Sequence, residues 1–168
     1  MLIGSQEQVQ GAFADAGWSQ ASKLGEKSKL ETLRAIAEDR EYSEAPVSIL
    51  YLHGRPPEMV FEKLNNTFSK RHHLRIWRRP DRYQGQPVWV SAATHDTGID
   101  FSAKDSTFIH KIDSQIDVER SKVANDLLLT GKVQSLLMVD RRNVPQHGQN
   151  ATDGNLNTDA KMAVIVLK

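Results

Sequence analysis

The sequence predicts an α+β fold: a single domain in which a mainly antiparallel β-sheet is covered by helices on one face. Three observations predict it: apolar residues at helical spacing near the start, period-two alternation through the middle, and two apolar runs at the end. A chain of 168 residues is long enough for one hydrophobic core. We expect one domain over residues 1–168, helical in 1–45 and sheet-rich in 46–168, with one helix near 115–130.

The N-terminal part predicts two amphipathic helices. Ser5 and Gln8 form a capping box, apolar residues follow at helical spacing, and Gly17 ends the helix. A second helix should begin near Ser28, whose hydroxyl caps it. Residues 47–57, VSILYLHGRPP, then predict a buried strand that ends at its glycine and prolines.

Period-two patterns predict a hairpin in the middle of the chain. In HLRIWR, Leu74 and Ile76 face one side and His73, Arg75 and Trp77 face the other, and PVWVSAATHD alternates in the same way. Because the turn-rich segment PDRYQGQ joins these two runs, we expect them to pair. The run STFIHKID predicts a third strand, in which His110 is a polar residue on an apolar stripe.

A helix and two strands complete the prediction. Ser114 and Asp117 form a capping signature, and the helix should run to Thr130 with Gly131 as its C-terminal stop. VQSLLMVD and KMAVIVL then predict two apolar strands, separated by a polar loop over residues 141–160. A loop of this length is usually functional or disordered.

Arg120 lies on the apolar face of the helix near 115–130. It follows Ile116 by four residues and precedes Val123 by three, so its side chain points inward with theirs. An inward guanidinium needs an acidic partner, which we expect to be one of three residues: Asp113, Asp117 or Asp96. Structural support is the role we favour for Arg120, because removing one partner of a buried ion pair costs about 3 to 5 kcal/mol.

Composition excludes several classes of protein. The formal charge is only +1, from 22 Lys and Arg against 21 Asp and Glu, so no specific nucleic-acid binding is expected. The lack of cysteine excludes disulfides, thiolate zinc sites and cysteine nucleophiles. The chain shows no signal-peptide pattern and no run of the roughly 18 apolar residues that a membrane span needs. We therefore expect a soluble, cytoplasmic protein, which could lie at the periphery of a membrane.

Side chains that can carry chemistry gather between Lys70 and Arg120, where four of the six histidines lie. The candidate catalytic residues are His95, Asp96, His110 and Asp113. The candidate metal ligands are His72, His73, His95 and His110. Imidazole nitrogen and carboxylate oxygen are ligands that zinc accepts, so a divalent metal that activates water is the candidate cofactor. No short motif fixes two ligands at once, and a structural role for these residues is the alternative that we favour.

We expect the polar face or end of the sheet to bring five of these side chains together. They are His73, His95, Asp96, His110 and Arg120. A convergence of this kind would form an open site, whereas separate partners would indicate structural roles.

A dense basic run provides a second candidate site. It comprises Lys70, Arg71, Arg75, Arg78, Arg79 and Arg82. Arginine binds phosphate through two hydrogen bonds, so a phosphate-bearing small molecule or a lipid head group is a candidate partner. The candidate ligand-binding residues are His73, Arg75, Arg78, Arg79 and Arg120. The alternative is an exposed charged strand that pairs with nearby acids and discourages aggregation.

The order of these motifs resembles the C-terminal domain of the LssY family. The resemblance rests on AGW, APVSILYLHGRPPEMVFEK, RHHLRIWR, PVWVSAATHDTGIDF, the DVER helix start and NATDGNLNTDAKMAVIVL, and it covers nearly the whole chain. One departure is Ala160, where the family tends to have a glycine after the Thr-Asp pair.

This resemblance implies a bacterial accessory or ligand-binding domain without a settled reaction. Related domains often follow membrane segments or a phosphatidic-acid-phosphatase-like membrane domain, with a link to type I secretion. The implied ligand is anionic or phosphate-bearing, and the implied protein partner belongs to a membrane or secretion system. A metal-dependent hydrolase that uses the His and Asp residues is the alternative function.

Overall fold

The computed structural model describes residues 1–21, 50–67, 70–102, 107–149 and 154–168. Within this part, β-strands dominate and two helices are present, α1 (Gln6–Asp15) and α3 (Ile116–Leu129). The strands of the main sheet are β1 (Leu2–Ile3), β2 (Ser19–Gln20), β3 (Met59–Thr67), β4 (Lys70–Tyr83), β5 (Gln86–Ser102), β6 (Thr107–Ile112), β7 (Val133–Asp140) and β10 (Lys161–Leu167). A separate hairpin consists of β8 (His147–Gln149) and β9 (Asn155–Asn157).

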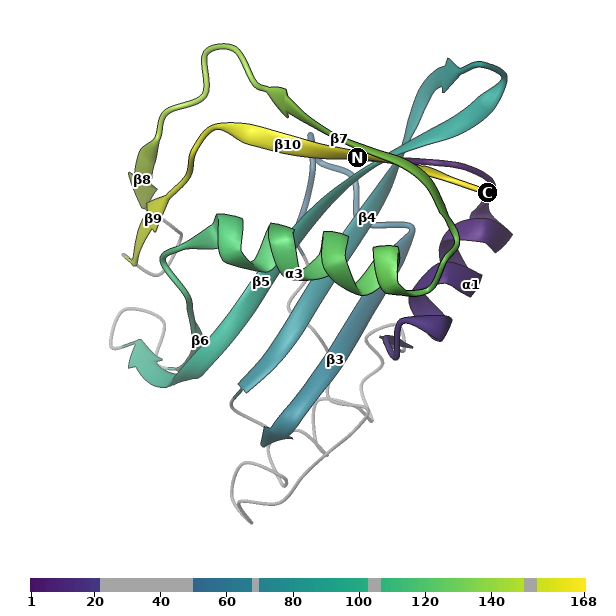
Figure 1. Ribbon diagram of the computed structural model, residues 1–168. Coiled ribbons are helices and arrows are strands. Elements are labelled where there is room, and N and C mark those ends of the chain that lie inside the picture. Colours follow the sequence, from purple (N-terminus) through teal and green to yellow (C-terminus); the bar gives the residue numbers. More distant parts are fainter. Residues whose placement is uncertain (22–49, 68–69, 103–106, 150–153) are drawn as a thin grey trace.

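The main sheet is mixed, although most of its pairs are antiparallel as predicted. Its strand order is β2-β3-β4-β5-β1-β10-β7, and β6 pairs with β5 beside this path. The parallel pair is β1 with β10, which brings the first strand beside the last (Figure 1). Sequence patterns did not predict β1, β2 or β3, because two of them have only two residues and β3 has no clear alternation.

The predicted hairpin is formed by β4 and β5. Leu74 pairs with Ala93 and Ile76 with Ser91, so Ala93 and Ser91 lie on the same face of the sheet as the apolar stripe of β4. The turn consists of Gln84 and Gly85, both with positive φ, which matches the right-handed twist of a hairpin. The predicted third strand is β6, which pairs with the end of β5.

A hydrophobic core joins both helices to the sheet. The ring of Phe13 on α1 stacks on Phe61 of β3 with centroids 4.8 Å apart, and Leu127 of α3 is fully buried in the same cluster. Figure 1 shows α3 lying across the strands of the sheet. Coverage of one whole face by helices stays a prediction, since the predicted helix at Ser28 lies outside the described residues. None of the described helices is long and apolar enough to cross a membrane.

Helix boundaries were predicted well at three of four ends. The capping box of Ser5 and Gln8 is present. Gly17 and Gly131 each follow the end of a helix, and both glycines have a positive φ. The predicted cap of α3 is wrong: its N-cap is Gln115, which makes no side-chain capping bond. The carboxylate of Asp117, in the first turn of α3, binds other partners instead.

The predicted buried strand at residues 47–57 is wrong in the part that the structure describes. Leu50 and Tyr51 are exposed and belong to no strand. A single bridge between Leu52 and Arg55 closes a tight turn there. The glycine and prolines that follow the apolar residues favour this turn. Residues 47–49 lie outside the described residues.

Candidate functional site

The predicted site residues of β4 and β5 are divided between the two faces of the sheet. His72 lies against Glu119 of α3, whereas the next residue, His73, lies against Asp96. Successive side chains of a strand point to opposite faces, so these two histidines cannot share a site. The prediction that His73 and His95 gather in one place is therefore wrong, because His95 stacks on His72.

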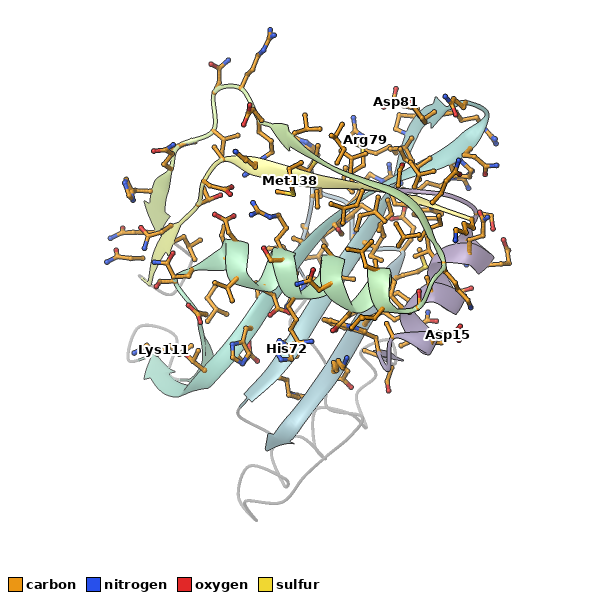
Figure 2. The ribbon with its side chains drawn as sticks, in the orientation of Figure 1. Asp15, His72, Arg79, Asp81, Lys111 and Met138 are labelled. Atoms are coloured by element: carbon orange, nitrogen blue, oxygen red, sulfur yellow. The ribbon has the colours of Figure 1, made fainter. Side chains whose placement is uncertain are left out.

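The helix-side cluster contains two histidines and two carboxylates. Nδ1 of His72 lies 2.8 Å from Oε2 of Glu119, and both side chains are buried. The rings of His72 and His95 stack with centroids 4.5 Å apart and an interplanar angle of 17°. Nδ1 of His95 lies 4.0 Å from Oδ2 of Asp113, which follows β6. Figure 2 shows His72 on the sheet, next to α3.

A small cavity adjoins this cluster. It has a volume of about 10 Å³ and is lined in part by His95, Asp113 and Glu119. Nε2 of His95 and Oε1 of Glu119 are buried and have no hydrogen-bond partner among the described residues. A cavity of this size has room for roughly one water molecule. Water bound there would satisfy buried polar atoms that otherwise destabilise the fold.

The described residues contain no group of three or more His, Asp or Glu side chains that could hold a metal ion. Of the candidate ligands, His72 and His95 lie together and His73 lies on the other face. The fourth, His110, lies on β6 opposite Ile99 of β5. The structure thus supports two paired histidines, but not the predicted set of converging ligands.

The opposite face of the sheet holds a buried charged network. Nη1 of Arg71 donates to Oε2 of Glu62 over 3.2 Å, and Nε2 of His73 lies 2.8 Å from Oδ2 of Asp96. Nη1 of Arg75 donates to a threonine hydroxyl on β5 over 3.3 Å. Burial raises the pKa of Glu62 to about 7, although the charge of Arg71 opposes the shift. Burial lowers the pKa of His73, against its hydrogen bond to Asp96.

The predicted basic run does not form one surface. Arg71 and Arg75 are buried in the network just described, whereas the later arginines lie nearer the turn of the β4–β5 hairpin. Arg78 lies over the ring of Trp89, with 5.8 Å from its guanidinium carbon to the centroid. Arg79 lies 3.7 Å from Asp81, and Figure 2 shows this pair far from His72. The proposed ligand-binding residues therefore fall in separate places.

Arg120 connects the first turn of α3 to the loop before β10 through ion pairs with Asp117 and Asp159. Its Nη1 donates to Oδ1 of Asp159 over 2.7 Å and to Oδ1 of Asp117 over 2.9 Å. Its Nη2 donates to the second oxygen of Asp159 over 3.0 Å. Of the three partners predicted, Asp117 is correct, while Asp159 was missed. The hydrogen bond from Arg120 lowers the pKa of Asp159 to about 2.

The same contacts explain the missing helix cap. Oδ1 of Asp117 also accepts a hydrogen bond from the hydroxyl of Thr158, over 3.0 Å. Oδ2 of Asp117 accepts from the backbone N–H of Asp159. The carboxylate is therefore directed toward the loop and away from the start of its own helix.

A groove lies between α3 and the point where the sheet divides. We call it the α3 groove, and its volume is about 290 Å³. The short strand β1 joins β5 to β10 at residues 88–89 and 165–166 only. Beyond β1, β5 and β10 diverge (Figure 1), and the groove is lined by residues of both strands and of α3. Its lining includes Leu74, Ser91, Ile116, Asp117, Arg120, Val123, Arg141, Lys161 and Ile165.

Sequence reasoning missed several residues of these sites. Glu119 follows Ile116 by three residues and precedes Val123 by four, so the spacing that marked Arg120 as inward also marks Glu119. Arg141 and Lys161 carried no comparable signal. They belong to opposite ends of a long polar loop, and only the pairing of β7 with β10 brings them together.

Comparison with protein families gave one match. A family model described as "LssY C-terminus" matches residues 1–162. No curated protein and no solved structure matches the chain.

Proposed function

The chain belongs to the LssY C-terminus family, and we propose that it is a ligand-binding domain that takes a small anionic molecule into the α3 groove. The observation that carries the proposal is the charge of the lining. Three of its charged side chains are cations, Arg120, Arg141 and Lys161, against the single carboxylate of Asp117. Ligand sites are typically concave and mostly apolar, with a few polar groups that fix orientation.

The three cations contribute in different ways. Arg120 is already held by Asp117 and Asp159, so its charge is largely neutralised and its position is fixed. Within the described residues, the side chains of Arg141 and Lys161 form no ion pair and no hydrogen bond, although the charge of Lys161 also helps to lower the pKa of Asp159. These two side chains therefore supply most of the attraction for an anion, and both are exposed at the mouth of the groove.

Titration with phenyl phosphate tests this proposal by calorimetry or by amide chemical shifts. Arg141→Gln and Lys161→Gln should each weaken binding about tenfold or more, since a hydrogen bond to a charged group contributes about 1.5 to 3 kcal/mol. Arg142→Gln is the matched control, because Arg142 is an exposed neighbour that does not line the groove. Equal loss in all three variants, or no loss in any, would contradict the proposal.

The origin of the anion decides the cellular role. A free phosphate-bearing molecule and a lipid head group both satisfy the charge pattern of Arg141 and Lys161. A link to a membrane or to a secretion system forms part of the proposal only for a lipid ligand. Two hairpin arginines, the exposed Arg78 and the partly exposed Arg79, would then serve as a second, weaker contact with an anionic surface.

Metal-dependent hydrolysis is the weaker proposal. Its support is the pair of stacked histidines beside the small cavity, which shares Ile116 and Thr94 with the α3 groove. Elemental analysis of the purified protein, repeated on His95→Ala, tests it. Stoichiometric metal that disappears in this folded variant would support a hydrolase, and a metal content that does not change would refute a site at His95.

A further inference from the structure

We infer that the ligand of the α3 groove is amphipathic: a single apolar chain under α3 that ends in a phosphate or carboxylate at Arg141 and Lys161. This inference rests on the proposed function and specifies the class of molecule. Its basis is that the groove has different chemistry at its two ends. Arg141 and Lys161 lie where β7 and β10 meet the polar loop, whereas Leu74, Val123 and Ile165 supply apolar walls from β4, α3 and β10.

The apolar end is formed by three elements. Leu74 comes from β4, Val123 from α3 and Ile165 from β10, and all three side chains are buried. Ile116 of α3 adds a partly buried wall. None of these side chains can form a hydrogen bond, so a polar group placed against them would lose its hydration without compensation. An apolar chain would gain from leaving water.

The cationic end lies where β7 and β10 meet the polar loop. Lys161 pairs with Asp140 in the ladder, and the N–H of the next residue, Arg141, donates to the carbonyl of Ala160 over 2.8 Å. Lys161 and Ile165 are four residues apart on one strand, which corresponds to about 13 Å. The groove therefore separates its charged end from its apolar end by roughly the length of a short alkyl chain.

The size of the groove limits the ligand further. Its volume of about 290 Å³ is at the lower end of small-molecule sites. One short chain fits this volume, whereas the two chains of a membrane phospholipid do not. A lipid could therefore bind through a single chain, with the other left outside.

A chain-length series tests the inference, with ethyl, butyl, hexyl and octyl phosphate as monomeric probes. Affinity should rise up to about fourfold for each added CH₂ group, because burying one contributes about 0.8 kcal/mol, until the groove is filled. Ser91→Leu should reduce the affinity of octyl phosphate at least tenfold by filling the space. Ser135→Leu is the matched control, since Ser135 is exposed on β7 and does not line the groove.

The possible results separate this inference from the proposed function. If all four phosphates bind with equal affinity and Arg141→Gln weakens each, the anion site stands and the amphipathic ligand is wrong. If octanol binds as tightly as octyl phosphate, the apolar site stands and the anion-binding function is wrong. If neither octyl phosphate nor octanol binds, both the proposed function and this inference are wrong.

Two further arms distinguish a free amphiphile from a lipid in a membrane. Vesicles of phosphatidylcholine with and without phosphatidic acid are mixed with the protein, and flotation measures the bound fraction. Flotation that requires phosphatidic acid and is lost in Arg141→Gln, but not in Arg142→Gln, assigns the ligand to a lipid. Binding of octyl phosphate without flotation assigns it to a free molecule.

Discussion

Nδ1 of His72 on β4 lies 2.8 Å from Oε2 of Glu119 on α3, and only 3% of Glu119 is exposed. This contact connects the helix to the centre of the sheet within a mainly apolar interface. A buried carboxylate is costly without a partner, so the pair constrains how α3 can lie on β4.

Glu119→Ala tests the importance of this pair. We expect it to lower the free energy of unfolding by about 3 to 5 kcal/mol, because it removes one member of a buried pair and leaves a small cavity. Urea denaturation followed by circular dichroism measures the change. Asn125→Ala, on the exposed side of α3, should alter stability by less than about 0.5 kcal/mol.

A double variant shows whether the effect comes from the unpaired partner. His72→Phe with Glu119→Leu replaces both polar groups by apolar ones and should recover much of the stability lost in Glu119→Ala. A double variant less stable than both single variants would show that the pair contributes net stability.

Glu62→Gln should change how stability depends on pH. Burial raises the pKa of folded Glu62 to about 7 from an ordinary value of 4.5, so the folded state holds this proton more tightly than the unfolded state. The stabilising contribution of the protonated form is therefore present below pH 4.5 and is lost as pH rises through 7. The glutamine side chain of the variant does not titrate, so the variant lacks this dependence on pH.

Denaturation at pH 5, 6, 7 and 8 measures this effect. Relative to the unsubstituted protein, the stability of Glu62→Gln should increase from pH 5 to pH 7 and level off toward pH 8. Glu62→Gln also weakens the contact with Arg71, which lowers the stability of the variant at every pH. The change of the stability difference with pH therefore reports the titration of Glu62. A constant difference between the two proteins would show that Glu62 does not titrate there.

Asp159→Asn should have the opposite dependence on pH. The hydrogen bond from Arg120 lowers the pKa of Asp159 to about 2 from 3.8, so its contribution is present above pH 3.8 and is lost as pH falls through 2. At pH 7 we expect a loss of about 1 kcal/mol, since the pair is partly exposed and screened by solvent.

Asp140→Asn provides the control for this substitution, because Asp140 is exposed at the end of β7 and its side chain forms no hydrogen bond or ion pair within the described residues. Thermal unfolding at pH 7 and at the lowest pH where the protein stays folded gives the comparison. Equal effects of the two substitutions at pH 7 would contradict the role of Arg120.

Ala160→Gly should stabilise the protein. Ala160 has a φ of 58°, in the left-handed region where a Cβ atom is unfavourable by about 1 to 2 kcal/mol. Glycine relieves this strain but gains freedom in the unfolded chain, so the expected net increase is about 0.5 to 1 kcal/mol. The family resemblance pointed to a glycine at this position.

Ala14→Gly is the matched control with the opposite sign. Ala14 is exposed in α1 with helical backbone, so glycine there should reduce stability by up to about 1 kcal/mol. Thermal unfolding of both variants gives the comparison, and a loss of stability in Ala160→Gly would contradict the assigned strain.

Local patterns were enough to predict several elements. The Ser5 capping box, the β4–β5 hairpin and the span of α3 each depend on residues close together in sequence, where spacing and turn chemistry determine the backbone. The same reasoning failed at residues 50–57, where apolar residues lie in an exposed turn. It also missed β1, since a strand of two residues has no period to detect.

The sequence by itself determined which residues can carry charge, that α3 has an inward arginine, and that the chain resembles the family whose model matches residues 1–162. Only the tertiary structure decided that His72 and His73 face opposite sides of the sheet in separate clusters, and that Arg141 and Lys161 meet at one groove. The physical reason is distance along the chain. Spacing fixes the direction of neighbouring side chains, whereas contacts between distant segments depend on strand pairing, which a single sequence does not encode locally.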